Sequence, residues 1–162
     1  LYPYAERGWI QFSSDSTPQK PQNVNNIKKQ LHIACLDDDL TIGKSIEAIL
    51  EQYPYQVTLI TDPLLSFHQL FENKPDLILC DIAMPKLDGY EVCAMLRQSK
   101  AFRQIPIIML TGKEGLIDRV KARMVGATDY LTKPFGASEL VLLLSKYTGS
   151  DLTALYLPKN LI

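Results

Sequence analysis

The chain has 162 residues, which is enough for one domain with a hydrophobic core of its own. Its 17 basic and 18 acidic residues give a net charge of −1, so the basic surface typical of nucleic-acid or anionic-membrane binding is not expected. The three cysteines have no metal-ligand spacing, and no apolar run reaches the roughly 18 residues that a transmembrane helix needs. We therefore expect a cytoplasmic protein that binds neither nucleic acid nor membrane.

Composition divides the chain into four segments. Residues 13–30 are rich in Ser, Pro, Gln, Asn and Lys and contain few hydrophobic residues, which predicts a polar linker. The apolar residues 1–12 before it resemble the end of a preceding domain, and a first residue other than Met suggests a fragment. A single domain is expected over residues 31–149, followed by a C-terminal tail at 150–162.

The first two predicted strands each precede a predicted helix. The apolar run 31–36 is followed by hydrophobic residues at helical spacing between Ile42 and Tyr53. The run 55–60 is followed by Asp62-Pro63, which is typical of an N-cap and the first turn of a helix, and this helix should end near residues 73–75.

The same order recurs three more times. The run 77–80 leads through a proline-containing loop to a helix that should begin at Asp88-Gly89 and end near Ser99. The runs 106–110 and 128–131 precede predicted helices at about 113–124 and at 138–147. Five alternations of strand and helix predict the α/β class, a (βα)5 domain with a doubly wound parallel sheet.

Reactive side chains stand where the predicted strands end. In doubly wound sheets, ligands bind beyond the carboxyl ends of the strands. Four strand ends therefore bring the following residues to one place: Asp37, Asp38 and Asp39 after the first strand, Asp81 after the third, Thr111 and Gly112 after the fourth, and Lys133 and Pro134 after the fifth.

These side chains suit phosphoryl transfer. Close carboxylates repel one another by roughly 4 kcal/mol a pair at an effective dielectric of 20, which favours a bound cation such as Mg²⁺. We expect Asp38 and Asp81 to bind Mg²⁺ directly, and Asp37 directly or through water. The Asp81 carboxylate is a competent nucleophile toward phosphorus, and Lys133 together with the Thr111 hydroxyl and the Gly112 N–H would contact phosphoryl oxygens.

Four strings of residues resemble the receiver domain of two-component response regulators. They are Leu36-Asp37-Asp38-Asp39, the segment from Asp81 to Tyr90, the run from Ile107 to Gly112, and the segment from Asp129 to Phe135. The resemblance implies the CheY-like strand order 2-1-3-4-5 and a signalling switch that is not a conventional enzyme. It also implies phosphorylation of Asp81 by a histidine kinase or phosphotransfer protein, followed by signalling to a downstream protein partner.

The resemblance assigns further roles residue by residue. It makes Asp37 and Asp38 the acidic pair, Ala83 a metal ligand through its backbone carbonyl, and Lys133 the phosphate-contacting residue. Thr111 and Tyr130 would form the switch pair, and the Lys133-Pro134 peptide bond would be cis. Because Ala83 has no side chain that could position water, we expect the phosphoryl group to persist longer than in receivers with a polar residue at this position.

The sequence says less about how the domain passes its signal to other proteins. The last helix carries five consecutive apolar residues, 140–144, more than one buried stripe requires, so the tail could cover them or a homodimer could form through the fourth helix, fifth strand and fifth helix. The segments 1–12, 88–93, 110–113 and 125–130 together resemble PatA-like response regulators, whose receiver is C-terminal.

The same residues allow alternative interpretations. The three aspartates could cap a helix, and Asp39 is expected to do so. Tyr130 could be an ordinary half-buried strand residue. A haloacid-dehalogenase-like phosphatase would need a second aspartate at position 83, and a flavodoxin-like cofactor binder would need a phosphate-binding loop that the sequence lacks. A phosphorylation-independent interaction module is the third alternative.

Overall fold

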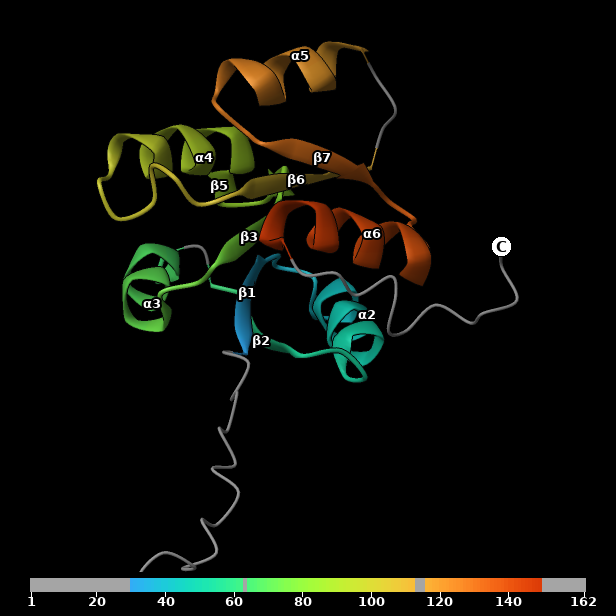
Figure 1. The fold of residues 1–162 in the computed structure, drawn as a ribbon. Helices are drawn as coiled ribbons and strands as arrows, with labels where there is room; N and C mark the ends of the chain where they lie inside the picture. Colours follow the sequence, from blue (N-terminus) through green and yellow to red (C-terminus); the bar gives the residue numbers. More distant parts are fainter. Residues whose placement is uncertain (1–29, 63, 113–115, 150–162) are drawn as a thin grey trace, which may run out of the picture.

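The computed structural model describes residues 30–62, 64–112 and 116–149. Five strands form one parallel sheet: β1 (Leu31–Leu36), β2 (Tyr55–Ile60), β3 (Leu77–Asp81), β6 (Ile107–Thr111) and β7 (Asp129–Thr132). Their order, β2-β1-β3-β6-β7, is the predicted 2-1-3-4-5 order counted over the strands of this sheet. The α/β prediction and the strand order are therefore confirmed (Figure 1).

Helices cover both faces of the sheet (Figure 1). On one face lie α2 (Leu40–Leu50) and α6 (Ala137–Thr148). On the other lie α3 (Ser66–Asn73), α4 (Gly89–Gln98) and α5 (Leu116–Met124). Side chains alternate along each strand, so Ile33 and Cys35 pack under α2 and α6, while Ala34 and Leu36 face the opposite way.

The start of α3 differs from the prediction. The sequence placed an N-cap at Asp62, whereas α3 begins at Ser66 with Leu65 in the N-cap position. Asp62 Oδ1 instead accepts a hydrogen bond from the Leu64 N–H at 2.9 Å, and the Asp62 carbonyl accepts one from Leu65. Aspartate closes a turn of this kind as readily as it caps a helix, because the same carboxylate-to-N–H bond serves both.

A small antiparallel hairpin was not predicted. β4 (Ala83–Met84) pairs with β5 (Leu87–Asp88) between β3 and α4, where the sequence suggested only a loop. Two-residue strands are too short to show an alternating pattern. Asp88 then caps α4 by accepting from the Tyr90 N–H at 2.8 Å, as the Asp88-Gly89 signal predicted.

The flanking segments at 1–12, 13–29 and 150–162, and the start of the helix predicted from residue 113, lie outside the described residues. Within the described part of the chain, no helix has the length and apolar character required to span a bilayer. Cys35, Cys80 and Cys93 are free thiols and all three are buried.

Candidate functional site

Four strand ends meet at the carboxyl edge of the sheet. Asp81 ends β3 and Thr111 ends β6, while Asp37 and Lys133 directly follow β1 and β7. Asp37, Asp81 and Thr111 are buried, at 3%, 5% and 5% exposure. Polar side chains are seldom buried without partners, so their partners indicate what the site can do.

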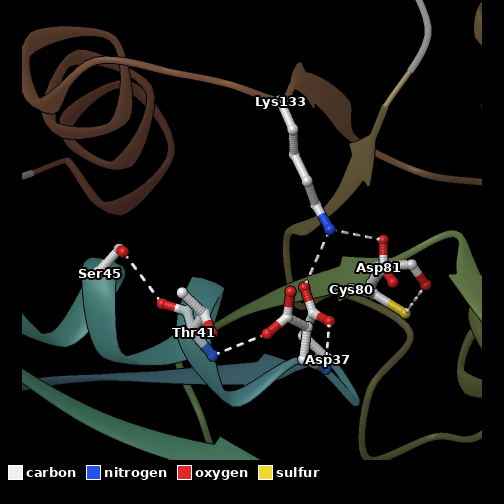
Figure 2. Close-up of polar contacts among 7 residues, drawn as sticks. Asp37, Thr41, Ser45, Cys80, Asp81 and Lys133 are labelled. Carbon is white, nitrogen blue, oxygen red and sulfur yellow. Dashed lines mark hydrogen bonds and ion pairs between the residues drawn. The ribbon is translucent and has the colours of Figure 1, made fainter.

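Lys133 joins the two buried carboxylates. Its Nζ lies 3.0 Å from Asp37 Oδ2 and 3.0 Å from Asp81 Oδ1, and Figure 2 shows the side chain extending toward both. Burial disfavours the charged ammonium, but its hydrogen bonds and ion pairs with Asp81 and Asp37 outweigh burial and raise the pKa of Lys133. Lys133 is therefore a cation held between two carboxylates that are distant in sequence. Asp37 lies 96 positions before it and Asp81 lies 52 positions before it.

One ammonium does not neutralise two carboxylates. Burial is the main cause that raises the pKa of Asp37 above its ordinary value, and repulsion from Asp81 adds to it. Hydrogen bonds from the Asp39 N–H and from Lys133 act in the opposite direction but do not cancel these effects. The site thus keeps an excess of negative charge that a bound cation would relieve.

Asp38 completes an acidic cluster. One carboxylate oxygen from each of Asp37, Asp38 and Asp81 lies within 4.8 Å of the other two, and Asp38 is exposed to solvent. Three hard oxygen donors with one open side fit Mg²⁺, which retains water and takes few protein ligands. The residues present therefore fit the cation that the sequence predicted.

The turn after β1 holds this cluster in place. Asp37 Oδ1 accepts from the Asp39 N–H at 2.9 Å, and Asp39 Oδ1 caps α2 by accepting from the Thr41 N–H at 2.8 Å. Asp39 is thus the helix cap, as expected, whereas Asp37 turns toward Lys133. The helix-capping explanation accounts for only one of the three aspartates.

Backbone hydrogen bonds between neighbouring strand ends fix the remaining geometry. The N–H of Asp37 donates to the backbone carbonyl of Ile60 at 3.2 Å, and the N–H of Lys133 donates to the backbone carbonyl of Thr111 at 2.6 Å. The Lys133-Pro134 peptide bond is cis. Rigid support of this kind keeps reacting groups in position without reorganisation.

Gly89 is a residue of the site that sequence reasoning used only as a helix start. A Cβ at this position would lie 2.1 Å from the Asp81 carbonyl oxygen and 2.8 Å from the Ile82 Cα. Only glycine permits this approach of α4 to the backbone that carries Asp81. The Asp88-Gly89 pair was the available signal, but it did not reveal the contact.

The two predicted switch residues share one face of the sheet. Met109 packs on the α3–α5 side and Leu110 on the other, so alternation returns Thr111 to the α3–α5 side, where Tyr130 also packs. Tyr130 is half-buried and pairs in register with Met109. Gly112 and Ala83 are both exposed, and Ala83 lies in the β4–β5 hairpin.

The sequence is similar to those of known proteins. A response regulator receiver domain model matches residues 33–145. Over 111 residues the chain is 39% identical to protein PilG of Pseudomonas aeruginosa, covering 68% of this chain and 82% of PilG. Over 108 residues it is 41% identical to the alkaline phosphatase synthesis regulator PhoP of Bacillus subtilis, covering 67% of this chain and 44% of PhoP.

A solved structure carries the same fold. The receiver domain of a sensor histidine kinase from Pseudomonas aeruginosa, crystallised with magnesium coordinated in its active-site cleft, superposes with a TM-score of 0.67 at 34% identity, covering 74% of this chain and 98% of that domain. Together with the family match and the carboxyl-edge site, this shows that the chain belongs to the response regulator receiver domain family.

Proposed function

We propose that this receiver accepts a phosphoryl group on Asp81 from a histidine kinase or phosphotransfer protein, and passes the signal to a protein partner by changing conformation. The observation that carries the proposal is the placement of Lys133 Nζ, 3.0 Å from Asp81 Oδ1 and 3.0 Å from Asp37 Oδ2. A lysine held there provides charge for a phosphoryl group arriving at Asp81.

In the proposed reaction, an oxygen of the Asp81 carboxylate attacks phosphorus and forms an acyl phosphate. The phosphorus–nitrogen bond of the donor phosphohistidine breaks, and its electron pair returns to the imidazole nitrogen. Lys133 contacts one phosphoryl oxygen, and the Thr111 hydroxyl with the Gly112 N–H contacts another. When bound by Asp37, Asp38, Asp81 and the Ala83 carbonyl, Mg²⁺ supplies positive charge that offsets the carboxylates and the phosphoryl oxygens.

The switch follows from the new charge. Thr111 moves toward the phosphoryl group, and Tyr130 moves inward on the face that the two residues share. Converting a two-state equilibrium from 1:99 to 99:1 takes about 5.5 kcal/mol of differential interaction. Contacts from Thr111 and Lys133 to a phosphoryl group of one to two negative charges are of the right kind to supply it.

The surface formed by α5, β7 and α6 is proposed to transmit the signal, either by forming a homodimer or by binding a downstream protein. Large apolar side chains are exposed on two of these elements, four on α5 and one on α6: Leu116, Ile117, Val120, Met124 and Leu142. Exposed apolar patches of this kind commonly mark interaction sites. A PatA-like architecture and a cytoplasmic location belong to the same proposal.

A phosphatase of the haloacid-dehalogenase class is disfavoured. That chemistry needs a second carboxylate two positions after the nucleophile, and this chain has Ala83 there.

The test is labelling with radioactive acetyl phosphate and Mg²⁺. Wild-type protein should incorporate acid-stable but base-labile label, and Asp81→Asn should incorporate none. Asp62→Asn is the matched control, because Asp62 is an exposed aspartate outside the acidic cluster. Label that persists in Asp81→Asn would show that Asp81 is not the phosphoacceptor.

A further inference from the structure

We propose that Arg119 of α5 is a positioning residue that holds the ring of Tyr130 in its present half-exposed place and thereby opposes the switch. This inference rests on the proposed role of Tyr130 and adds to it a residue that neither the sequence motifs nor the phosphoryl-transfer chemistry involves.

The contact itself is a cation–π interaction. The Arg119 Cζ lies 4.8 Å from the centroid of the Tyr130 ring, within the range of about 6 Å at which a guanidinium attracts the face of an aromatic ring. Arg119 is exposed and Tyr130 is half-buried, so the guanidinium covers the ring from the solvent side. Movement of the ring away from α5 would lose this contact.

Packing alone does not lock the ring. A pocket of about 200 Å³ lies beside it, bordered by Arg119, Arg123, Thr128 and Asp129 among others. The inner side of Tyr130 packs against the hydrophobic cluster under α4 and α5. A ring with space on one side can be held by a weak contact, so a single arginine can influence where it lies.

The part of α5 that carries Arg119 is attached to α4 through the neighbouring residue, Asp118. The Tyr90 hydroxyl donates to Asp118 Oδ1 at 3.1 Å, which ties the first turn of α5 to the first turn of α4. Burial and the bond to Asp118 raise the pKa of Tyr90 to about 12, so its hydroxyl remains a donor at physiological pH. Arg119 therefore sits on a helix end that is fixed next to the site.

α5 buries few of its own side chains. Ala122 is the single buried side chain among its described residues, whereas Leu116, Ile117, Val120 and Met124 are exposed by about half or more. The contacts of Asp118 and Arg119 therefore add to the packing of Ala122 in attaching this helix to the domain. Loss of the Arg119 contact on switching would also loosen α5, the helix proposed to signal.

The size of the effect follows from the type of contact. An exposed cation–π interaction changes an equilibrium by about twofold to fivefold. If Arg119 favours the unswitched state, its removal should raise apparent affinity for any ligand that requires the switched state, because that state becomes more populated. A substitution that merely damages the fold would lower affinity instead.

The experiment measures beryllofluoride binding in the presence of Mg²⁺, since this complex mimics a phosphoryl group. Arg119→Ala should bind about twofold to fivefold more tightly than wild type. Arg123→Ala is the matched control, because Arg123 is one turn further along α5 and borders the same pocket. Arg119→Ala should have no effect when Tyr130 is already replaced by leucine.

A second readout follows the ring directly. In protein labelled with 3-fluorotyrosine, the Tyr130 resonance, assigned with Tyr130→Phe, should shift in Arg119→Ala without beryllofluoride and should stay in place in Arg123→Ala. Unchanged or weaker binding by Arg119→Ala, or an equal gain in Arg123→Ala, would overturn the inference while leaving the role of Asp81 intact. Wild-type protein that binds no beryllofluoride would overturn both the proposed function and this inference.

Discussion

Gly89→Ala would place a methyl group against the backbone that carries the phosphoacceptor candidate. The new Cβ would lie 2.1 Å from the Asp81 carbonyl oxygen, whereas ordinary contact begins at 3.4 Å, so these atoms must separate by 3.4 − 2.1 = 1.3 Å. Both nearest obstacles, this oxygen and the Ile82 Cα, are backbone atoms, so no side-chain rotation relieves the clash. The start of α4 or the end of β3 must shift.

Such overpacking typically costs about 1–3 kcal/mol, and the better helix propensity of alanine returns only part of it. We expect the free energy of unfolding of Gly89→Ala in urea to fall by about 2 kcal/mol. Because a misplacement of about 1 Å can cost about 100-fold in rate, labelling by acetyl phosphate should slow by about one to two orders of magnitude.

Gly112→Ala is the control for stability, because a Cβ there meets no atom within 4 Å. Its free energy of unfolding should stay close to that of wild type. Wild-type stability and labelling rate in Gly89→Ala would refute the steric argument and show that the approach of α4 to Asp81 is readily relaxed.

Three further predictions concern single side chains. Arg97→Met should lower the free energy of unfolding in urea by about 2–3 kcal/mol, because the guanidinium donates to the carbonyls of Gly126 and Ile105 at 2.6 Å each; a loss below about 0.5 kcal/mol would contradict this. Asp37→Asn mimics the protonated carboxyl. Since the pKa of Asp37 is raised on folding, protonation favours the fold as the pH falls through that raised value, and the ionised form is unfavourable at pH 7. This variant should therefore gain about 1 kcal/mol at pH 7 without metal and bind Mg²⁺ more weakly by calorimetry, and a loss of stability would argue that Lys133 outweighs burial. Ala83→Asn should shorten the lifetime of the phosphorylated form in a label-decay assay, and an unchanged decay rate would show that a polar side chain at this position does not position water.

Local patterns were sufficient where a structural element depends on its own residues. The five strands of the parallel sheet lie within one residue of their predicted bounds, because buried parallel strands appear as short apolar runs between polar turns. The start of α4 was predicted from Asp88-Gly89, since the cap is a contact between Asp88 and Tyr90, two residues apart. The start of α3 was missed because Asp62 closes a turn before the helix, and a local sequence pattern does not distinguish these two uses of aspartate.

The chemistry of the candidate site followed from the sequence because parallel strands end at one edge. That rule alone predicted that Asp37, Asp81 and Lys133, which are distant in sequence, lie close together. The rule does not give side-chain geometry. Two buried carboxylates share one ammonium, and Asp37 binds Lys133 while Asp39 caps α2. These contacts depend on rotamers that the packed structure selects.

By itself, then, the sequence determined the strand order through its family motifs, the identity of the acidic cluster and the chemistry that it suits. The tertiary structure alone decided which residues from different helices touch. Gly89 approaches Asp81, and Arg119 covers Tyr130, because α4 and α5 dock on the sheet at particular positions. The apolar side chains of Val92, Cys93 and Leu96 set the position of α4, whereas Ala122 and the Tyr90–Asp118 hydrogen bond set that of α5. No local pattern encodes these contacts between distant residues.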